Sequence, residues 1–264
     1  MMIIILALVF LTLSLLTGGD KTAKSLITVC MDFVVLFISI KLMNMGISPI
    51  GISVLAVILI TAITVYYQNE VNLKTHAAFI SVLLTVLAMF GLICLIVKLA
   101  HLQGFTAIGG EHINETNGYK GNIGRNMFAV QVAVVVFALA GSIIDTAVAI
   151  SSGMYEVYRH EQKLSSRELF DSGINIGKEI LNSTVNTLVF IFFGEYMLLM
   201  VNYLMFYSFS TMINSKDFAQ GVTTISVCVI GCVLIIPIIS FISAYAYTAF
   251  SKENTTTKCG SIRF

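Results

Sequence analysis

The sequence predicts an all-α fold, a polytopic transmembrane helical bundle of about seven spans. Of the 264 residues, 57% are hydrophobic and only 11% are charged, and the mean hydropathy is +0.92. An ordinary soluble domain carries about 25% charged residues. The apolar residues also occur in long runs, and a helix needs about 20 of them to cross a bilayer. With only Pro49 and Pro237 there is no proline-rich linker, so we expect one integral membrane domain over residues 1–264.

The order of the apolar runs divides this domain into three parts. The runs lie at residues 2–17, 25–43, 48–67, 76–100, 126–154, 178–205 and 219–249. The first run is short, but no basic segment precedes it and no A-x-A cleavage site follows it, so we interpret it as a retained helix rather than a signal peptide. We therefore expect an N-terminal span and loop over 1–24, a six-helix core over 25–250 and a cytoplasmic tail over 251–264.

The basic residues predict the orientation of the chain in the membrane. With seven spans, the loops on one side hold ten of the 15 Lys and Arg residues and the loops on the other side hold five. The positive-inside rule places the richer set in the cytoplasm. We therefore expect a multi-pass protein of the cell membrane, in a bacterial context, with its N-terminus outside and its C-terminus inside.

The polar turn after residue 154 carries a helix start. Ser165 and Glu168 have the spacing of a capping box, in which each side chain satisfies a free backbone amide of the new helix. Apolar residues then recur at helical spacing, which predicts an amphipathic helix along the inner surface that leads into the next span. We expect Gly194-Glu195 to break that span, leaving residues 196–215 at the outer interface, and Pro237 to kink the last span.

One carboxylate lies inside an apolar run and is the main candidate for function. Residues three, four and seven apart share a helix face, so Asp145 lies on a stripe of small residues. The members that we expect to pack against a neighbouring helix are Gly141, Ser142, Ala149 and Ser152, with Ala138 at one end. Small faces let helices approach closely. A carboxylate at membrane depth usually faces protein or water and marks a pathway or relay.

The following span offers a matching polar stripe. Asn182 and Asn186 are four residues apart and are flanked by Ser183 and Thr187. Because both spans flank one turn, Asp145 and the two asparagines can reach a similar depth. Burial favours the neutral form of a carboxyl group, so Asp145 could load and release a proton while Asn182, Asn186 and Thr187 hydrogen-bond it. The alternative is a structural carboxyl group that sets the helix register. Asp32, in the second run, could join Asp145 or lie nearer the cytoplasmic end.

Other function classes find little support in the sequence. The net charge of +1, without a basic patch, gives no indication of nucleic-acid binding. His101, Glu111, His112 and Glu115 share one polar loop, but their spacing favours a solvated loop over a metal site. The cysteines lack the spacing of a zinc site and favour apolar packing. We find no nucleophile–base set and no nucleotide motif, so we expect no enzyme activity, no cofactor and no metal.

From Gly141 onward the chain resembles the YibE/F-like family of membrane proteins. The resemblance lies in GSIIDTAVAISSGMYEV around Asp145, in ELF and SGINIG at 168–177, in Asn186-Thr187-Leu188 and in Gly231 through Pro237. It covers most of residues 126–245, while residues 1–100 match in hydropathy only. An acidic-x-x-Arg pair of the family pattern is replaced here by Gly221 and Thr224.

The same stretch is more distantly similar to half of the transmembrane region of resistance-nodulation-division transporters and related protein-export subunits. That resemblance implies a six-helix transporter-like core, coupling to the proton-motive force and pairing with a second half. This chain departs from it in having only residues 44–48 where a large extracytoplasmic domain would stand, and in lacking an arginine deep in its sixth span.

These observations lead to two hypotheses of different classes. The first is a permease component, one half of a paired transporter, that is proton-coupled through Asp145. Its partners would be membrane lipid and either a second copy of the chain or a paralogous membrane protein carrying an extracytoplasmic domain. The second hypothesis is a non-transporting membrane scaffold or assembly factor in which Asp145 is structural. The two differ in whether Asp145→Asn is tolerated, because Asn keeps hydrogen bonds and cannot titrate.

Overall fold

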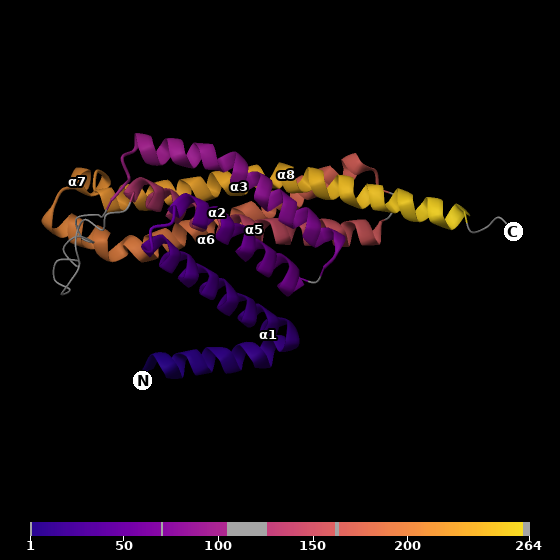
Figure 1. Ribbon diagram of the computed structural model, residues 1–264, viewed down its shortest axis with the longest axis horizontal. Coiled ribbons are helices and arrows are strands. Elements are labelled where there is room, and N and C mark those ends of the chain that lie inside the picture. Colours follow the sequence, from indigo (N-terminus) through magenta and orange to yellow (C-terminus); the bar gives the residue numbers. More distant parts are fainter. Residues whose placement is uncertain (1, 70, 105–125, 162–163, 261–264) are drawn as a thin grey trace.

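The computed structural model describes residues 2–69, 71–104, 126–161 and 164–260, and most of these residues are in helices (Figure 1). The elements in chain order are α1 (Met2–Asn44), α2 (Pro49–Ala62), the π-helix η1 (Ile63–Tyr67), α3 (Leu73–Leu99), α5 (Met127–His160), α6 (Ser166–Phe206), α7 (Phe209–Ile213) and α8 (Lys216–Gly260). The described residues contain no strand. The predicted all-α class is therefore confirmed.

Within the described residues, six helical segments are long and apolar enough to cross a membrane. They are Thr22–Asn44, Pro49–Tyr67, Leu73–Leu99, Met127–His160, Ser166–Phe206 and Lys216–Ala249. Each coincides with one of the six predicted core spans, and their mean hydropathies lie between 1.8 and 2.9. The first predicted span corresponds to a shorter apolar helix, Ile4–Asp20. The chain is thus a multi-pass membrane protein with six long spans and one shorter N-terminal helix.

A sharp bend at Gly19 joins this N-terminal helix to the first long span. Gly19 has φ 55° and ψ −143°, a backbone conformation that is open essentially to glycine alone. Gly18 is equally constrained, since a Cβ atom there would lie 1.5 Å from Oγ1 of Thr22. The loop expected over residues 18–24 is therefore a bend within α1. The N-terminal helix, which precedes the bend, points away from the other helices (Figure 1).

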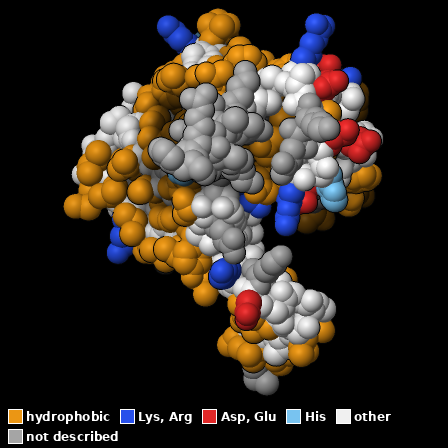
Figure 2. All heavy atoms as spheres, turned by 90° about the vertical axis from the view of Figure 1, so that its right-hand side faces the viewer, with side chains coloured by type: hydrophobic (Ala, Val, Ile, Leu, Met, Phe, Trp, Pro, Cys, Tyr) orange, Lys and Arg blue, Asp and Glu red, His pale blue; other side chains and the backbone are white. Residues whose placement is uncertain are grey.

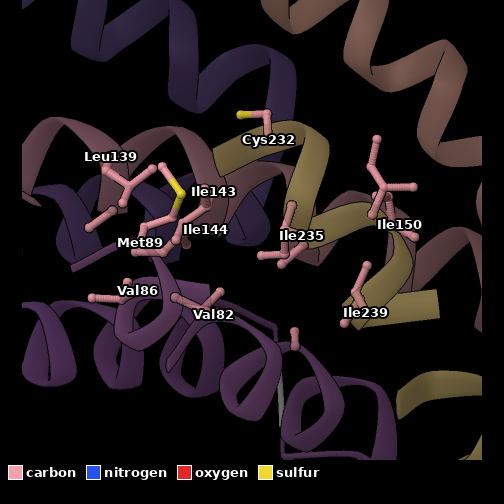
Figure 3. Close-up of a cluster of buried hydrophobic side chains, with 14 of the residues drawn as sticks. Val82, Val86, Met89, Leu139, Ile143, Ile144, Ile150, Cys232, Ile235 and Ile239 are labelled. Atoms are coloured by element: carbon pink, nitrogen blue, oxygen red, sulfur yellow. The ribbon is translucent and has the colours of Figure 1, made fainter. Parts of the chain in front are cut away.

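The core of the bundle lies among α3, α5 and α8, which pack against one another. Figure 3 shows side chains from the three helices meeting there, and the labelled ones are Val82, Val86, Met89, Leu139, Ile143, Ile144, Ile150, Cys232, Ile235 and Ile239. Most of them are 0–3% exposed. A close-packed interior of this kind holds its helices in one arrangement, and α5 is therefore a rigid support for Asp145.

The predicted capping box at the start of α6 is confirmed. The backbone amide of Ser165 donates to Oε2 of Glu168 over 2.8 Å, and the amide of Glu168 donates to Oγ of Ser165 over 3.3 Å. The expected break at Gly194-Glu195 is wrong, because α6 continues without interruption to Phe206. Nothing crowds Gly194, so an ordinary helix passes through it. A short helix, α7, then precedes α8, which runs through Pro237 to Gly260.

Many charged side chains lie at one end of the bundle. This end holds the η1–α3 and α5–α6 connections, which the basic residues predict to be cytoplasmic. Figure 2 views this end and shows Lys, Arg, Asp, Glu and His side chains at its edge, with hydrophobic side chains covering the flanks. Apolar flanks and a charged end are what a membrane-spanning bundle requires.

Candidate functional site

Asp145 lies on the exposed side of α5 and lines an open pocket of about 190 Å³. The pocket is lined by Thr64, Gln68, Asn69, Asp145, Val148, Ala149 and Ser152. Five of these seven side chains carry oxygen, and none of them is basic. Among the described residues, the Asp145 carboxylate has no hydrogen bond or ion pair. An unpaired carboxylate in an open pocket can exchange its occupant, which a carboxylate held by several donors cannot do readily.

The wall opposite α5 is formed by η1 and the residues directly after it. A π-helix closes i→i+5 hydrogen bonds, and such segments often occur at functional sites. Asn69 follows Thr64 by five residues, and its amide nitrogen donates to the backbone carbonyl of Thr64 over 3.3 Å. The Gln68 amide nitrogen donates to Oγ of Ser25 on α1 over 3.3 Å. The irregular helix thus brings three polar side chains to one side.

Asp32 on α1 is attached to this wall through Thr64. The Thr64 hydroxyl donates to Oδ2 of Asp32 over 3.0 Å, while Oδ1 of Asp32 is buried and has no partner in the described part of the chain. Asp32 does not line the pocket itself. Of the two expectations for Asp32, the structure therefore favours an indirect connection to Asp145, through one threonine.

The expected partners of Asp145 on α6 lie elsewhere. Asn182, Asn186 and Thr187 are exposed and do not line the pocket. The Thr187 hydroxyl donates to the carbonyl of Ser183 one turn earlier, over 3.0 Å. The α6 face that packs against α8 instead carries Gly173 and Gly177. This packing turns the two asparagines away from the bundle.

Most of the small residues expected to pack on a neighbouring helix, Gly141, Ser142, Ala149 and Ser152, border open space or the pocket instead. Nothing within 4 Å would meet a Cβ atom added to Gly141, and Ala149 and Ser152 line the pocket. Of the four, Ser142 alone touches another helix at a polar group, since its carbonyl accepts the Cys232 thiol over 3.7 Å. The expectation that Gly141 packs on a helix of this chain is therefore wrong. The stripe borders a pocket because α2 and η1 leave space beside it.

Close approach occurs instead at three other glycines. A Cβ atom on Gly173 would lie 2.6 Å from Sδ of Met154, one on Gly177 would lie 2.5 Å from Cγ2 of Ile236, and one on Gly231 would lie 2.2 Å from Cδ1 of Leu139. These contacts join α6, α8 and α5. The glycines let the helices approach to a distance that any side chain would prevent.

A buried polar cluster lies near the pocket end of α5. The Ser151 hydroxyl donates to the Lys74 carbonyl over 2.7 Å, and it lies 2.9 Å from the Tyr247 hydroxyl, which donates to the Ser151 carbonyl over 3.1 Å. Ser151 and Tyr247 are 1% and 0% exposed. This cluster ties α3, α5 and α8 together and fixes the depth of the adjacent residue Ser152 in the pocket wall.

No group of three His, Cys, Asp or Glu side chains suited to a metal ion occurs within the described residues. Glu111, His112 and Glu115 lie outside those residues, so the solvated-loop interpretation of that loop stays a prediction. Thr64, Gln68 and Asn69 were missed by sequence reasoning. The sequence does contain a signal for them. Thr64 lies inside an apolar run, and Gln68 and Asn69 follow it by four and five residues, where that run ends.

Comparison with known proteins identifies this architecture at the level of the family. No curated protein and no solved structure matches the chain. A model of YibE/F-like proteins matches residues 6–249, which include most of the shorter N-terminal helix, both walls of the pocket and all six long spans. The chain therefore belongs to the YibE/F-like protein family.

Proposed function

We propose that this protein is a permease component that is coupled to proton movement through Asp145 and works as one half of a paired assembly. The observation that supports it is the position of Asp145, an unpaired carboxylate in an oxygen-lined pocket between apolar, membrane-length helices. Ionisable groups in membrane segments are energetically costly and mark ion pathways or relays.

The surroundings of Asp145 favour this function over a scaffold. A structural carboxylate that fixes helix register needs hydrogen-bond partners to offset its desolvation. Asp145 has none in the described part of the chain, whereas the Ser151–Tyr247 cluster supplies such structural bonds nearby. In the proposed role Thr64, Asn69 and Ser152 surround the carboxyl group, in place of the asparagines of α6.

Pairing with a second half is supported by the polar residues left on the outside of α6. Asn182 and Asn186 are exposed on a candidate span, and an amide in contact with lipid tails lacks partners. A second six-helix core, from another copy or from a paralogue, would supply them. Purification in mild detergent followed by mass determination tests this part, and a lone monomer from native membranes would contradict it.

Infrared spectroscopy of the purified chain in lipid nanodiscs tests the carrier role. A carboxyl group that takes up a proton gains the carbonyl stretching band of the neutral acid as the buffer is acidified. We expect Asp145→Asn to abolish one such band while the protein remains folded. Glu156→Gln, which removes an exposed carboxylate of the same helix outside the pocket lining, is the matched control and should leave that band in place. An unchanged spectrum in Asp145→Asn would favour the scaffold.

A further inference from the structure

The geometry points to a second occupant of the pocket beside Asp145: a small monovalent metal cation, for which Na⁺ is the probe. The inference rests on the proposed function, because it names an ion that the same carboxylate would exchange. It is carried by the hydrogen bonds of the pocket wall, which show for each polar side chain which atoms are already engaged and which are unused.

Each polar side chain of the η1 wall has one donor engaged in a hydrogen bond within the protein. The Thr64 hydroxyl donates to Asp32, the Asn69 amide nitrogen to the Thr64 carbonyl, and the Gln68 amide nitrogen to Ser25. The orientation of the Asn69 amide follows from chemistry, since a backbone carbonyl can only accept. In the described part of the chain, the Thr64 hydroxyl therefore has only lone pairs left for an occupant, while Gln68 and Asn69 each keep an amide oxygen without a partner and a second N–H.

The α5 wall adds acceptors of the same kind. Asp145 contributes a carboxylate, and Ser152 contributes a hydroxyl oxygen with two lone pairs. Neither side chain has a hydrogen-bond partner in the described ranges. Val148 and Ala149 complete this wall with apolar groups. The described lining thus combines one negative charge with neutral oxygen atoms and contains no Lys or Arg.

This set of ligands selects the class of ion. Carboxylate, hydroxyl and amide oxygens suit hard cations, whereas transition metals favour imidazole and thiolate. None of the described residues that line the pocket is a His or a Cys. Divalent cations are usually held by several carboxylates, but among the described residues only one carboxylate lines this pocket. One negative charge balances one monovalent cation and leaves the occupied pocket neutral.

Asp32 would hold the η1 wall in the cation-binding arrangement. Its Oδ2 accepts the Thr64 hydroxyl proton, which directs the lone pairs of that oxygen away from Asp32. Thr64→Ser keeps this bond, whereas Thr64→Val removes both the bond and the ligand. Asp32 is therefore a positioning residue, and Thr64, Gln68, Asn69, Asp145 and Ser152 are the candidate ligands.

Thermal unfolding of the purified full chain in nanodiscs tests the inference. The midpoint is measured in sodium chloride, potassium chloride and N-methylglucamine chloride at equal ionic strength. An ion that binds only the folded state lowers the unfolding constant by the factor 1 + [ion]/Kd, about 11-fold at ten times Kd. We expect a saturable rise of the midpoint in Na⁺, a smaller one in K⁺ and none in N-methylglucamine.

Three variants separate a pocket-bound ion from a general salt effect. Asp145→Asn removes the charge, and Ala149→Leu fills the pocket while the carboxylate remains; both should abolish the Na⁺-dependent rise. Glu156→Gln removes an exposed carboxylate from the same helix outside the lining and should retain it. If Asp145→Asn fails to fold, Ala149→Leu still decides. Broadening of the ²³Na magnetic resonance line, reversed in Ala149→Leu, provides direct evidence.

Equal midpoints in all three salts, or a Na⁺ effect that persists in Ala149→Leu, would overturn the cation site. The infrared result for Asp145 is independent of this outcome. If Asp145→Asn abolishes a carbonyl band but Na⁺ does not raise the midpoint, the cation site is contradicted and the proton carrier is retained. If Na⁺ raises the midpoint only when the pocket is intact, and Asp145→Asn leaves the infrared spectrum unchanged, the cation site is supported and the proton carrier is contradicted.

Discussion

Two stripes of small residues on neighbouring helices have opposite surroundings. On α6, Gly173 and Gly177 lie against α8, and an added Cβ atom would come within 2.7 Å of a neighbouring side chain at either position. On α5, Gly141 has open space and Ala149 borders the pocket. Small residues at helical spacing allow close approach, but they do not require it. The same pattern can make a helix contact or leave space for an occupant.

The first prediction tests the packed stripe. Gly177→Leu would place a branched side chain where a single Cβ atom already lies 2.5 Å from Ile236. Overpacking costs about 1–3 kcal/mol and occasionally more, and here backbone separation must change as well. We expect a strongly lowered melting midpoint, measured by size-exclusion chromatography after heating. A midpoint equal to that of the unaltered chain would mean that α6 and α8 are farther apart than the structure shows.

A second prediction concerns the contact between α8 and α5. Gly231→Ala should be destabilising by about 1–3 kcal/mol, because its Cβ atom would lie 2.2 Å from Cδ1 of Leu139. Leu139→Ala should cost about 2–5 kcal/mol through the cavity that it leaves.

The double variant sharpens the second test. Removing the Leu139 side chain creates room for the new methyl group, so the double variant should be less destabilised than the sum of the two single variants. Contacting residues show interaction energies of about 0.5–3 kcal/mol. Strict additivity, measured in the same melting assay, would contradict the contact.

The third prediction concerns the pocket side of α5. Ala149→Leu replaces a small wall residue next to open space, so we expect a change in stability within about 0.5 kcal/mol, as for surface substitutions. The effect on ion binding should be large by comparison. A large loss of stability would indicate that α5 and η1 are in contact there, with no pocket between them.

The smallest expected effect belongs to Gly141. Nothing within 4 Å would meet a Cβ atom at this position, and alanine is about 1 kcal/mol more favourable than glycine inside a helix. Gly141→Ala should therefore leave the melting midpoint unchanged or raise it slightly. Gly173→Ala serves as its matched opposite. A clear drop for Gly141→Ala would mean that a partner chain lies against this stripe.

The sequence predicted the positions of the helices in the chain more reliably than the contacts that each helix makes. Six spans and the capping box at Ser165 were correctly predicted, because hydropathy, length and capping are properties of contiguous residues. The break at Gly194-Glu195 was not found, because a single glycine beside a good helix former does not interrupt a long apolar helix.

The sequence did not predict which side chains surround Asp145. The sequence predicts Asn182, Asn186 and Thr187 of α6 as partners of Asp145, because one turn connects the two helices. The structure instead places Thr64, Gln68 and Asn69 beside it, from a helix about 80 residues earlier in the chain. The rotation of α6 about its axis is determined by Gly173 and Gly177 against α8, and this rotation exposes Asn182 and Asn186.

The sequence by itself determined that this is a multi-pass helical membrane protein, where its long spans lie, and that Asp145 is an exceptional carboxylate within them. Only the tertiary structure decided which oxygen atoms surround that carboxylate and which small residues are in contact. The physical reason is that transfer of apolar segments into a bilayer depends on local composition. The rotation of each helix depends instead on contacts between residues far apart in the chain.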